Sequence, residues 1–278
     1  MNDLSLTEQL CDGLIEAARL AGRQEIMPRF RNLAPEMVDT KSGPDDLVTI
    51  ADTRAEAVIG EAVRALMPDA LIVGEEAVEE DPTLLTRVAE APAAVIIDPI
   101  DGTANFAAGL AVFGVILSVV IDRVPVFGLL YDPVMDDWIA GAKGQGAWFG
   151  RPDHTRSPLS MPTARPVDQC RGFISTSIFE ADAQPAIAAT LPRFRRVLNL
   201  RCSCHEYRML ATGHGEFILS PGAKPWDHTA GTLIVEELGG RIEAGGPYPY
   251  DPAHPKGPIL AVANRDTALA LSDWNFSR

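Results

Sequence analysis

The stretch 95–106, VIIDPIDGTANF, constrains the fold most, because it places two carboxylates and a hydroxyl where a buried strand is expected to end. The run 93–97 is short, apolar and rich in β-branched residues, which is typical of a strand covered on both faces. Pro99 pushes Asp98 into an extended conformation and cannot continue a central ladder. We therefore expect the chain to turn at Asp98.

Asp98 and Asp101 are expected to face one small volume beyond this turn. Gly102 suits a tight bend, and Asp101 or Thr103 can cap a following helix. Two carboxylates about 4 Å apart repel by roughly 4 kcal/mol at an effective dielectric constant near 20, so the pair needs a proton or a cation. Oxygen ligands without nearby Cys or His indicate Mg²⁺ or Mn²⁺. The alternative is that both are ordinary turn residues, since Asp-Pro often opens a loop.

A second strand candidate, 71–73, also ends in carboxylates, in the sequence Gly74-Glu75-Glu76. Open α/β sheets present their ligands beyond the carboxyl ends of the strands, so Glu75 is expected to join Asp98 in one site. For Glu76, an exposed acidic loop is an equally plain interpretation. Lys41, in the preceding polar loop, is interpreted by itself as a solvated charge, as is Asp46.

Two further aspartates stand at the starts of predicted helices. Asp52 opens a stretch of helical spacing that ends near Leu66, and it is a plausible cap. Asp227 lies in the first turn of an apolar helix that closes at Gly239-Gly240, where it can simply complement the helix dipole. The neighbouring His228 can act as a general base, but packing or an indirect contact is the more ordinary role for such a residue.

The remaining pattern predicts two halves in one compact unit. An amphipathic helix opens the chain and weakens before Pro28. Strands are then expected at 113–121, 125–131, 138–142 and 147–149, as an antiparallel meander. After a Pro-rich break at 151–166 we expect a strand at 172–176, helices at 182–190 and 202–212, and a strand at 216–219. This predicts an N-terminal α+β half, 1–150, with most of the metal ligands, and a C-terminal α/β half, 167–278, that completes the site.

Composition narrows the class of protein. The 24 basic and 38 acidic residues give a net charge of -14, which argues against a nucleic-acid surface as the main partner. We find neither a signal-peptide pattern nor an apolar run approaching 18 residues, and we expect a cytoplasmic protein without a membrane partner. The cysteines do not follow a metal-binding spacing, so we expect reduced residues in the core or near the site: Cys11, Cys170, Cys202 and Cys204.

Four motifs, in order, resemble the inositol monophosphatase family. They are Lys-x-x-x-x-Asp-Leu-Val-Thr-x-x-Asp from Lys41, Gly-Glu-Glu from Gly74, Asp-Pro-Ile-Asp-Gly-Thr-x-Asn-Phe from Asp98 and Trp-Asp-x-x-x-Gly from Trp226. The resemblance covers almost the whole chain. It implies an α/β (α+β) fold, a layered αβαβα sandwich of the sugar-phosphatase type, and lithium-sensitive hydrolysis of phosphomonoesters with two or three Mg²⁺ ions per site. It also implies a homodimer.

The resemblance implies a ligand set for these ions. Glu75, Asp98 and the carbonyl group of Ile100 would hold one metal, and Asp98, Asp101 and Asp227 would hold a second. A third, weaker Mg²⁺ would lie near Glu75. Because four carboxylates repel a phosphate dianion, the metals must reverse the local field before the substrate can enter.

Catalytic roles follow by the same resemblance. Thr103, paired with Asp52, would orient or deprotonate the attacking water, and these two with Glu75 form the expected catalytic set. The backbone N–H groups of Gly102 and Thr103 would receive the phosphate. Thr103 is too weak an acid to be a good nucleophile without a strong base, so we predict direct in-line attack by water and no phosphoenzyme.

Two departures from the family pattern concern the substrate. The chain has Arg201-Cys202-Ser203-Cys204 where family members have Gly-Ser/Thr-Ala-Ala, and Ser220 where inositol-specific members have a Glu. Losing that carboxylate removes an acceptor for a polyol. Arg201 either meets a second anionic group or forms only a surface salt bridge. With Gly102 and Thr103, the expected substrate contacts are Arg201, Ser203 and Ser220.

The sequence therefore predicts a Mg²⁺-dependent phosphomonoesterase acting on a small phosphorylated metabolite similar to inositol 1-phosphate. Histidinol phosphate, 3′-phosphonucleotides and fructose 1,6-bisphosphate are the rival substrates. A non-enzymatic alternative is a regulatory binding protein that keeps the fold, because some bacterial relatives also act through macromolecular partners.

Overall fold

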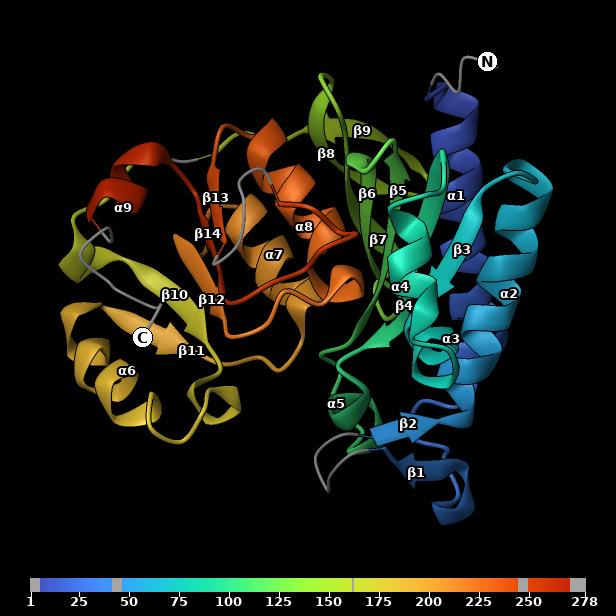
Figure 1. The fold of residues 1–278 in the computed structure, drawn as a ribbon, viewed down its shortest axis with the longest axis horizontal. Helices are drawn as coiled ribbons and strands as arrows, with labels where there is room; N and C mark the ends of the chain where they lie inside the picture. The colour runs from blue at the N-terminus through green and yellow to red at the C-terminus, as the bar shows by residue number, and fades with distance from the viewer. Residues whose placement is uncertain (1–5, 42–46, 162, 245–249, 271–278) are drawn as a thin grey trace.

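The computed structural model describes residues 6–41, 47–161, 163–244 and 250–270, which form alternating layers of helices and sheets (Figure 1). The helices are α1 (Glu8–Ala21), α2 (Ile50–Leu66), α3 (Glu75–Glu80), α4 (Thr83–Val88), α5 (Thr103–Ala107), α6 (Gln184–Thr190), α7 (Ser203–Ala211), α8 (Pro225–Glu237) and α9 (Arg265–Ala270). Within this part of the chain, no helix is both long and apolar enough to cross a membrane.

The larger sheet has seven strands in the described chain. They are β3 (Leu71–Gly74), β4 (Ala93–Asp101), β5 (Gly114–Ile121), β6 (Val124–Asp132), β7 (Asp137–Ala142), β8 (Gly146–Arg151) and β9 (His154–Pro158), paired in sequence order. Only β3 and β4 run parallel, and β4 to β9 form an antiparallel meander. The predicted meander is confirmed, although it continues through β9 into the patch expected to be a break.

The smaller sheet has five described strands in the order β11-β10-β12-β14-β13, and a two-stranded ribbon lies apart from both sheets. The five strands are β10 (Arg171–Ile174), β11 (Arg196–Leu198), β12 (Phe217–Ser220), β13 (Arg241–Ala244) and β14 (Ile259–Val262); the ribbon is β1 (Val38–Thr40) with β2 (Leu47–Thr49). β10 is parallel to both its neighbours, whereas β14 is antiparallel to β12 and β13. β11, β13 and β14 were not predicted from the sequence.

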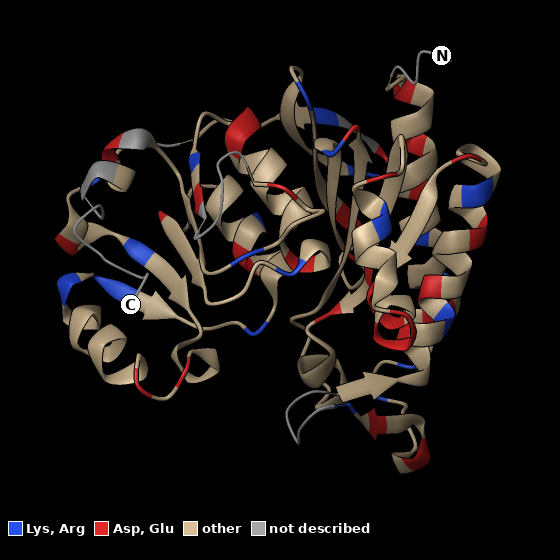
Figure 2. Cartoon of the chain, viewed as in Figure 1, with Lys and Arg blue, Asp and Glu red and all other residues tan. Residues whose placement is uncertain are grey.

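Apolar clusters between the layers hold them together as an αβαβα sandwich (Figure 1). Alternate residues of the large sheet face opposite ways, so Leu117 packs toward α1 and α2, while Ile116 packs toward α7 and α8. The other side of the α7–α8 layer packs on the small sheet, whose far face contacts α6 and α9. Each fully buried Leu or Ile contributes about 1.5–3 kcal/mol to the stability of this packing. Basic and acidic residues are both distributed over the helices, strands and loops of the molecule (Figure 2).

The predicted turn at Asp98 is wrong, because β4 continues to Asp101 with every residue buried. The register with β5 shifts between Asp98, which pairs with Ile116, and Asp101, which pairs with Gly114. Pro99, which has no N–H group, lies inside this irregularity and leaves no ladder donor missing. The bulge lets β4 present both carboxylates at its end.

Two cap predictions are also corrected. Thr49, and not Asp52, is the N-cap of α2; Asp52 is the third helical residue, and its carboxylate accepts the Thr49 N–H at 2.9 Å in a capping box. Gly102 occupies the N-cap position of α5, without a side-chain cap from Asp101 or Thr103. Gly102 has a φ of +89°, and a Cβ there would come within 2.9 Å of the Val112 carbonyl oxygen, so glycine is required.

Candidate active site

Three aspartates from two distant parts of the chain meet at one point. Carboxylate oxygens of Asp98, Asp101 and Asp227 all lie within 4.8 Å of one another. Asp98 and Asp101 come from the end of β4, and Asp227 from the first turn of α8, which packs across the large sheet. The end of β4 and the start of α8 therefore bring together the Asp98–Asp101 pair and Asp227, which the sequence places far apart.

The carboxylate of Asp101 is held by the N-terminus of α7. Its Oδ2 accepts the backbone N–H of Cys204 and, at 3.1 Å, the thiol of Cys202. Both cysteines are reduced and buried, as expected for residues near the site. Asp98 is fixed locally, since its Oδ1 accepts the Ile100 N–H at 3.1 Å.

Glu75 reaches the same place from the end of β3 and the start of α3. The ammonium group of Lys41 lies 3.1 Å from Glu75 Oε1 and 2.8 Å from Glu76 Oε1. The Lys41 side chain is only 7% exposed, so its interpretation as a solvated loop charge is wrong. Although burial opposes it, the two carboxylates raise the pKa of Lys41 above its ordinary value. Asp46, also interpreted as a solvated charge, lies outside the described residues.

Thr103 lies at the start of α5, directly above a buried carboxylate of α2. Its Oγ1 is 3.1 Å from Asp52 Oδ1 and 3.0 Å from the Ile100 carbonyl oxygen, and its single proton serves one of these acceptors at a time. Burial raises the pKa of Asp52 to about 7, against the opposing hydrogen bonds from Thr49. The structure therefore forms the expected Thr103–Asp52 pair, and the pKa of its carboxylate lies near neutral pH.

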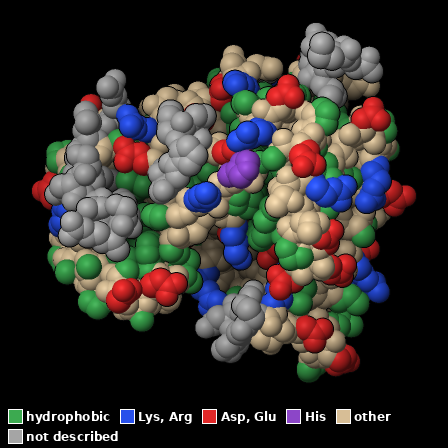
Figure 3. Space-filling model, in the orientation of Figure 1, with side chains coloured by type: hydrophobic (Ala, Val, Ile, Leu, Met, Phe, Trp, Pro, Cys, Tyr) green, Lys and Arg blue, Asp and Glu red, His purple; other side chains and the backbone are tan. Residues whose placement is uncertain are grey.

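Two adjoining pockets receive these groups. The first, about 160 Å³, is lined by Leu47, Glu75, Asp98, Ile100, Asp101, Gly102, Thr103, Ala104, Arg201, Lys224 and Asp227. The second, about 180 Å³, is lined by Asp101, Ser175, Ile178, Arg201, Cys202, Ser203, Glu206, Leu219, Ser220, Asp227 and His228. Every site residue predicted from the sequence lines one of them except Asp52, which lies buried beneath Thr103. In the space-filling view, basic side chains lie in the hollow between the two halves (Figure 3).

The carboxylates of the first pocket need either protons or a cation to relieve their mutual repulsion. Burial, reinforced by the neighbouring carboxylates, raises the pKa of Asp98 well above its ordinary value, and burial with the charge of Asp227 raises that of Asp101 to about 7. Burial also raises the pKa values of Glu75 and Asp227, although Lys41 and Lys224 oppose the shift. A hard divalent cation bound by oxygen atoms would relieve this repulsion, so the residues fit Mg²⁺ or Mn²⁺.

Two residues that hold the site together, Glu56 and Asn105, were not predicted from the sequence. Glu56 of α2 accepts the N–H groups of Glu76 and Ala77 at 2.9 and 3.0 Å, which satisfies the first turn of α3. Asn105 donates to the carbonyl groups of Val112 and Leu200, both at 2.8 Å, and so joins α5 to the loop before α7. Asn105 is part of the matched motif, but no local pattern signals either role.

His228 belongs to the core, as its ordinary interpretation predicted. Its Nδ1 lies 3.0 Å from the Tyr207 hydroxyl, and burial lowers its pKa to about 4. Its Nδ1 is thus paired with Tyr207, although His228 also lines the second pocket.

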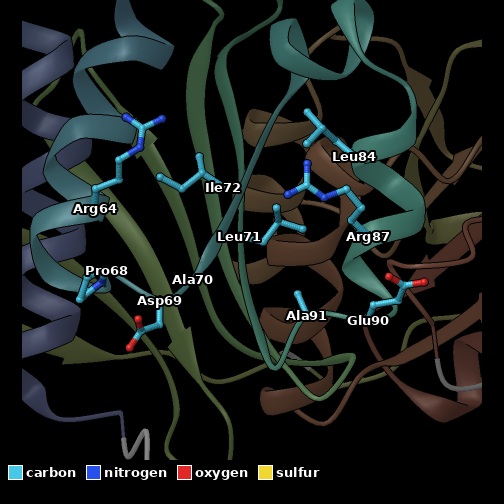
Figure 4. A pocket seen from close by; sticks show the side chains of 10 residues that line it. All are labelled: Arg64, Pro68, Asp69, Ala70, Leu71, Ile72, Leu84, Arg87, Glu90 and Ala91. Atoms are coloured by element: carbon cyan, nitrogen blue, oxygen red, sulfur yellow. The ribbon is translucent and has the colours of Figure 1, made fainter.

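A larger cavity, about 560 Å³, lies at the opposite end of β3 from Glu75 (Figure 4). Leu71 and Ile72 line it, with Arg64 and Arg87 on facing walls. It contains neither a cluster of carboxylates nor a paired hydroxyl and base. Although this cavity is larger, its lining residues therefore do not support a catalytic site there.

Comparisons with known proteins show the family and the fold of this chain. The model of the inositol monophosphatase family matches residues 6–272. The fructose-1,6-bisphosphatase/inositol-1-monophosphatase of Aquifex aeolicus is 31% identical over 227 residues, 80% of this chain and 81% of the relative. The Nus factor SuhB of Escherichia coli K12 is 30% identical over 239 residues, 82% of each protein. The solved structure of the Thermotoga maritima IMPase aligns with a TM-score of 0.78 at 24% identity, over 96% of each chain.

Proposed function

Because this chain belongs to the inositol monophosphatase family, whose members are phosphomonoesterases, we propose that it hydrolyses a small phosphorylated metabolite with the help of Mg²⁺. The observation that carries this proposal is the cluster of Asp98, Asp101 and Asp227 oxygens within 4.8 Å, beside the Thr103–Asp52 pair. Family membership by itself makes the chain a phosphoric monoester hydrolase; the metal, the residue roles and the substrate are our proposals.

The proposed ligand set uses groups that line the first pocket. Glu75, Asp98 and the Ile100 carbonyl would hold one Mg²⁺, and Asp98, Asp101 and Asp227 a second, with a third, weaker site near Glu75. When bound, the ions would neutralise the phosphoryl oxygens, lower the pKa of the attacking water and stabilise the leaving alkoxide. Burial raises the pKa values of Glu75 and Glu76, and the adjacent charge of Lys41 opposes that rise.

The chain's own residues position the water and move its proton. Thr103 Oγ1 accepts a hydrogen bond from the water and donates its own proton to Asp52 Oδ1, 3.1 Å away. Because the pKa of Asp52 is about 7, its carboxylate is available as a general base at neutral pH. The N–H groups of Gly102 and Thr103 would receive the phosphate. Water then attacks in line, and no phosphoenzyme forms.

Several small phosphomonoesters remain candidate substrates. We propose an inositol 1-phosphate-like compound, with histidinol phosphate, a 3′-phosphonucleotide or fructose 1,6-bisphosphate as alternatives. The printed name of the Aquifex aeolicus relative supports both inositol 1-phosphate and fructose 1,6-bisphosphate. Ser203 and Ser220 line the second pocket, where the part of the substrate beyond the phosphate would lie.

A second candidate function is a regulatory binding protein, favoured by the 30% identity to a protein named Nus factor SuhB. Binding alone would not need a hydroxyl paired with a buried base, so Thr103 and Asp52 favour the enzyme. We also propose lithium sensitivity, a cytoplasmic location and a homodimer. A monomer in sedimentation experiments at micromolar concentration would contradict the dimer.

The test is phosphate release from inositol 1-phosphate, histidinol phosphate, 3′-phosphoadenosine 5′-phosphate and fructose 1,6-bisphosphate, with Mg²⁺ and with a chelator. We expect magnesium-dependent turnover of at least one compound, which Asp98→Asn abolishes. Asp132→Asn is the matched control, because Asp132 is also a buried aspartate but lies outside the cluster. Turnover of no compound, by a protein that binds Mg²⁺, would favour the regulatory function.

A further inference from the structure

Arg201 has a backbone conformation that glycine adopts readily and arginine rarely does. Its φ is +50°, in the left-handed region, where a side chain costs stability. Four other described residues besides glycine share this feature: Arg31, Asp122, Arg123 and Asp136. Of the five, only Arg201 lines either pocket of the site. Strain kept at such a position points to function.

The surrounding hydrogen bonds impose this conformation. Asn199 Oδ1 accepts the Arg201 N–H at 2.9 Å, and buried Glu206 accepts the Leu200 N–H at 3.0 Å. Asn105 holds the Leu200 carbonyl from the side of α5. The loop is therefore fixed on both sides, and Arg201 is placed where the first pocket adjoins the second.

The second pocket is lined by one arginine and three carboxylates, of which Asp101 and Asp227 are proposed metal ligands and the third is Glu206. Arg201 is its only Lys or Arg among the lining residues described, whereas Lys224 lines the first pocket alone. Ser220 stands where a glutamate would accept a hydrogen bond from a polyol hydroxyl. Its own hydroxyl donates a hydrogen bond to the Gly222 carbonyl oxygen at 3.0 Å. The Glu206 carboxylate is engaged by the loop. A neutral polyol thus finds no ionised acceptor here beyond the proposed metal ligands.

We propose that Arg201 is a specificity-determining residue that selects phosphomonoesters carrying a second anionic group, a phosphate or a carboxylate, on the alcohol part. This inference rests on the proposed phosphatase function. With the phosphate to be cleaved in the first pocket, the alcohol part extends into the second, past the guanidinium. Arginine binds carboxylate and phosphate groups through two parallel N–H donors, which gives both affinity and orientation.

Two matched pairs of substrates test the proposal. 2-Phosphoglycerate differs from glycerol 2-phosphate by a carboxylate in place of a hydroxymethyl group, and fructose 1,6-bisphosphate differs from fructose 1-phosphate by a second phosphate. We expect kcat/KM of the wild-type protein to favour the second-anion member of at least one pair by about tenfold to a hundredfold, the range for a hydrogen bond to a charged group. Preference in both pairs indicates a general anion site, and preference in the fructose pair alone indicates a phosphate site.

Variants separate recognition from folding. Arg201→Gln and Arg201→Gly should reduce the preference to about one, and Arg201→Lys should retain part of it. Arg201→Gly also removes the backbone strain, so its melting temperature should not fall below that of the wild type. Asp122→Gly, which relieves a φ of +47° in the turn between β5 and β6, is the control that should leave the preference unchanged.

The possible failures are distinguishable. Turnover without preference in either pair, or a preference that survives Arg201→Gln, overturns the assignment of Arg201 and leaves the phosphatase function standing. Absence of turnover for all four compounds and for the panel above, in a folded protein with Mg²⁺, overturns both proposals.

Discussion

Without metal, the buried carboxylate cluster should make the protein less stable as the pH rises through neutrality. Burial and neighbouring charges raise the pKa values of Asp98, Asp101 and Asp227, so the folded state keeps protons that the unfolded chain releases near pH 4. The free energy of unfolding falls with pH wherever the folded state binds more protons. This contribution is fully present below the unfolded pKa and is lost as the pH rises through the folded pKa.

The pKa of Asp101 gives the size of this pH-dependent change in the free energy of unfolding. Its pKa rises from 3.8 to about 7, a difference of roughly 3 units. At about 1.4 kcal/mol per unit, Asp101 contributes at most about 4 kcal/mol, which corresponds to a melting temperature lower by up to about 8 °C at pH 8 than at pH 4. Because the carboxylates of the cluster compete for the same protons, the total is not a multiple of this value.

Thermal unfolding followed by circular dichroism, from pH 4 to 8 in chelator, measures the effect. His228 acts in the opposite direction below pH 6.5, because burial lowers its pKa to about 4. The informative quantity is therefore the difference between the wild type and Asp101→Asn, and the variant should gain stability relative to the wild type as the pH rises. Excess Mg²⁺, which binds the deprotonated cluster, should stabilise the wild type more at pH 8 than at pH 5. A difference that is independent of pH would refute this reasoning.

Two further substitutions test the geometry of the site. Thr103→Ala removes the hydroxyl that is proposed to position the water, so we expect kcat to fall about a hundredfold or more. The affinity for Mg²⁺, measured by calorimetry, should stay unchanged. A kcat within threefold of the wild-type value would exclude this role for Thr103. Gly128→Ala places a Cβ 2.7 Å from the Ala230 carbonyl oxygen, so it should push α8 away from β6. We expect the free energy of unfolding in urea to fall by about 1–3 kcal/mol, and Mg²⁺ binding to weaken because Asp227 moves with α8. Unchanged stability and affinity would contradict this expectation.

The sequence by itself determined the order of the elements and the candidates for the chemistry. Alternation in the meander and helical spacing in α1, α2 and α8 are local patterns, so they predict elements without knowledge of the fold. The carboxylates Glu75, Asp98, Asp101 and Asp227 were recognised because each stands where a periodic run begins or ends. Polar residues at such positions are brought together when strand ends and helix starts share an edge.

Only the tertiary structure decided which partners these residues have. Lys41 is a buried ion-pair partner of Glu75 because the residue that follows β1 lies against the start of α3, a contact that spans 34 residues. Glu56 caps a helix that begins 19 positions later, and Cys202 holds an aspartate 101 positions earlier. The φ of +50° at Arg201 likewise follows from hydrogen bonds to the surrounding loop and helix. Burial, pairing and backbone strain depend on which distant segments pack together, and local periodicity contains no record of that packing.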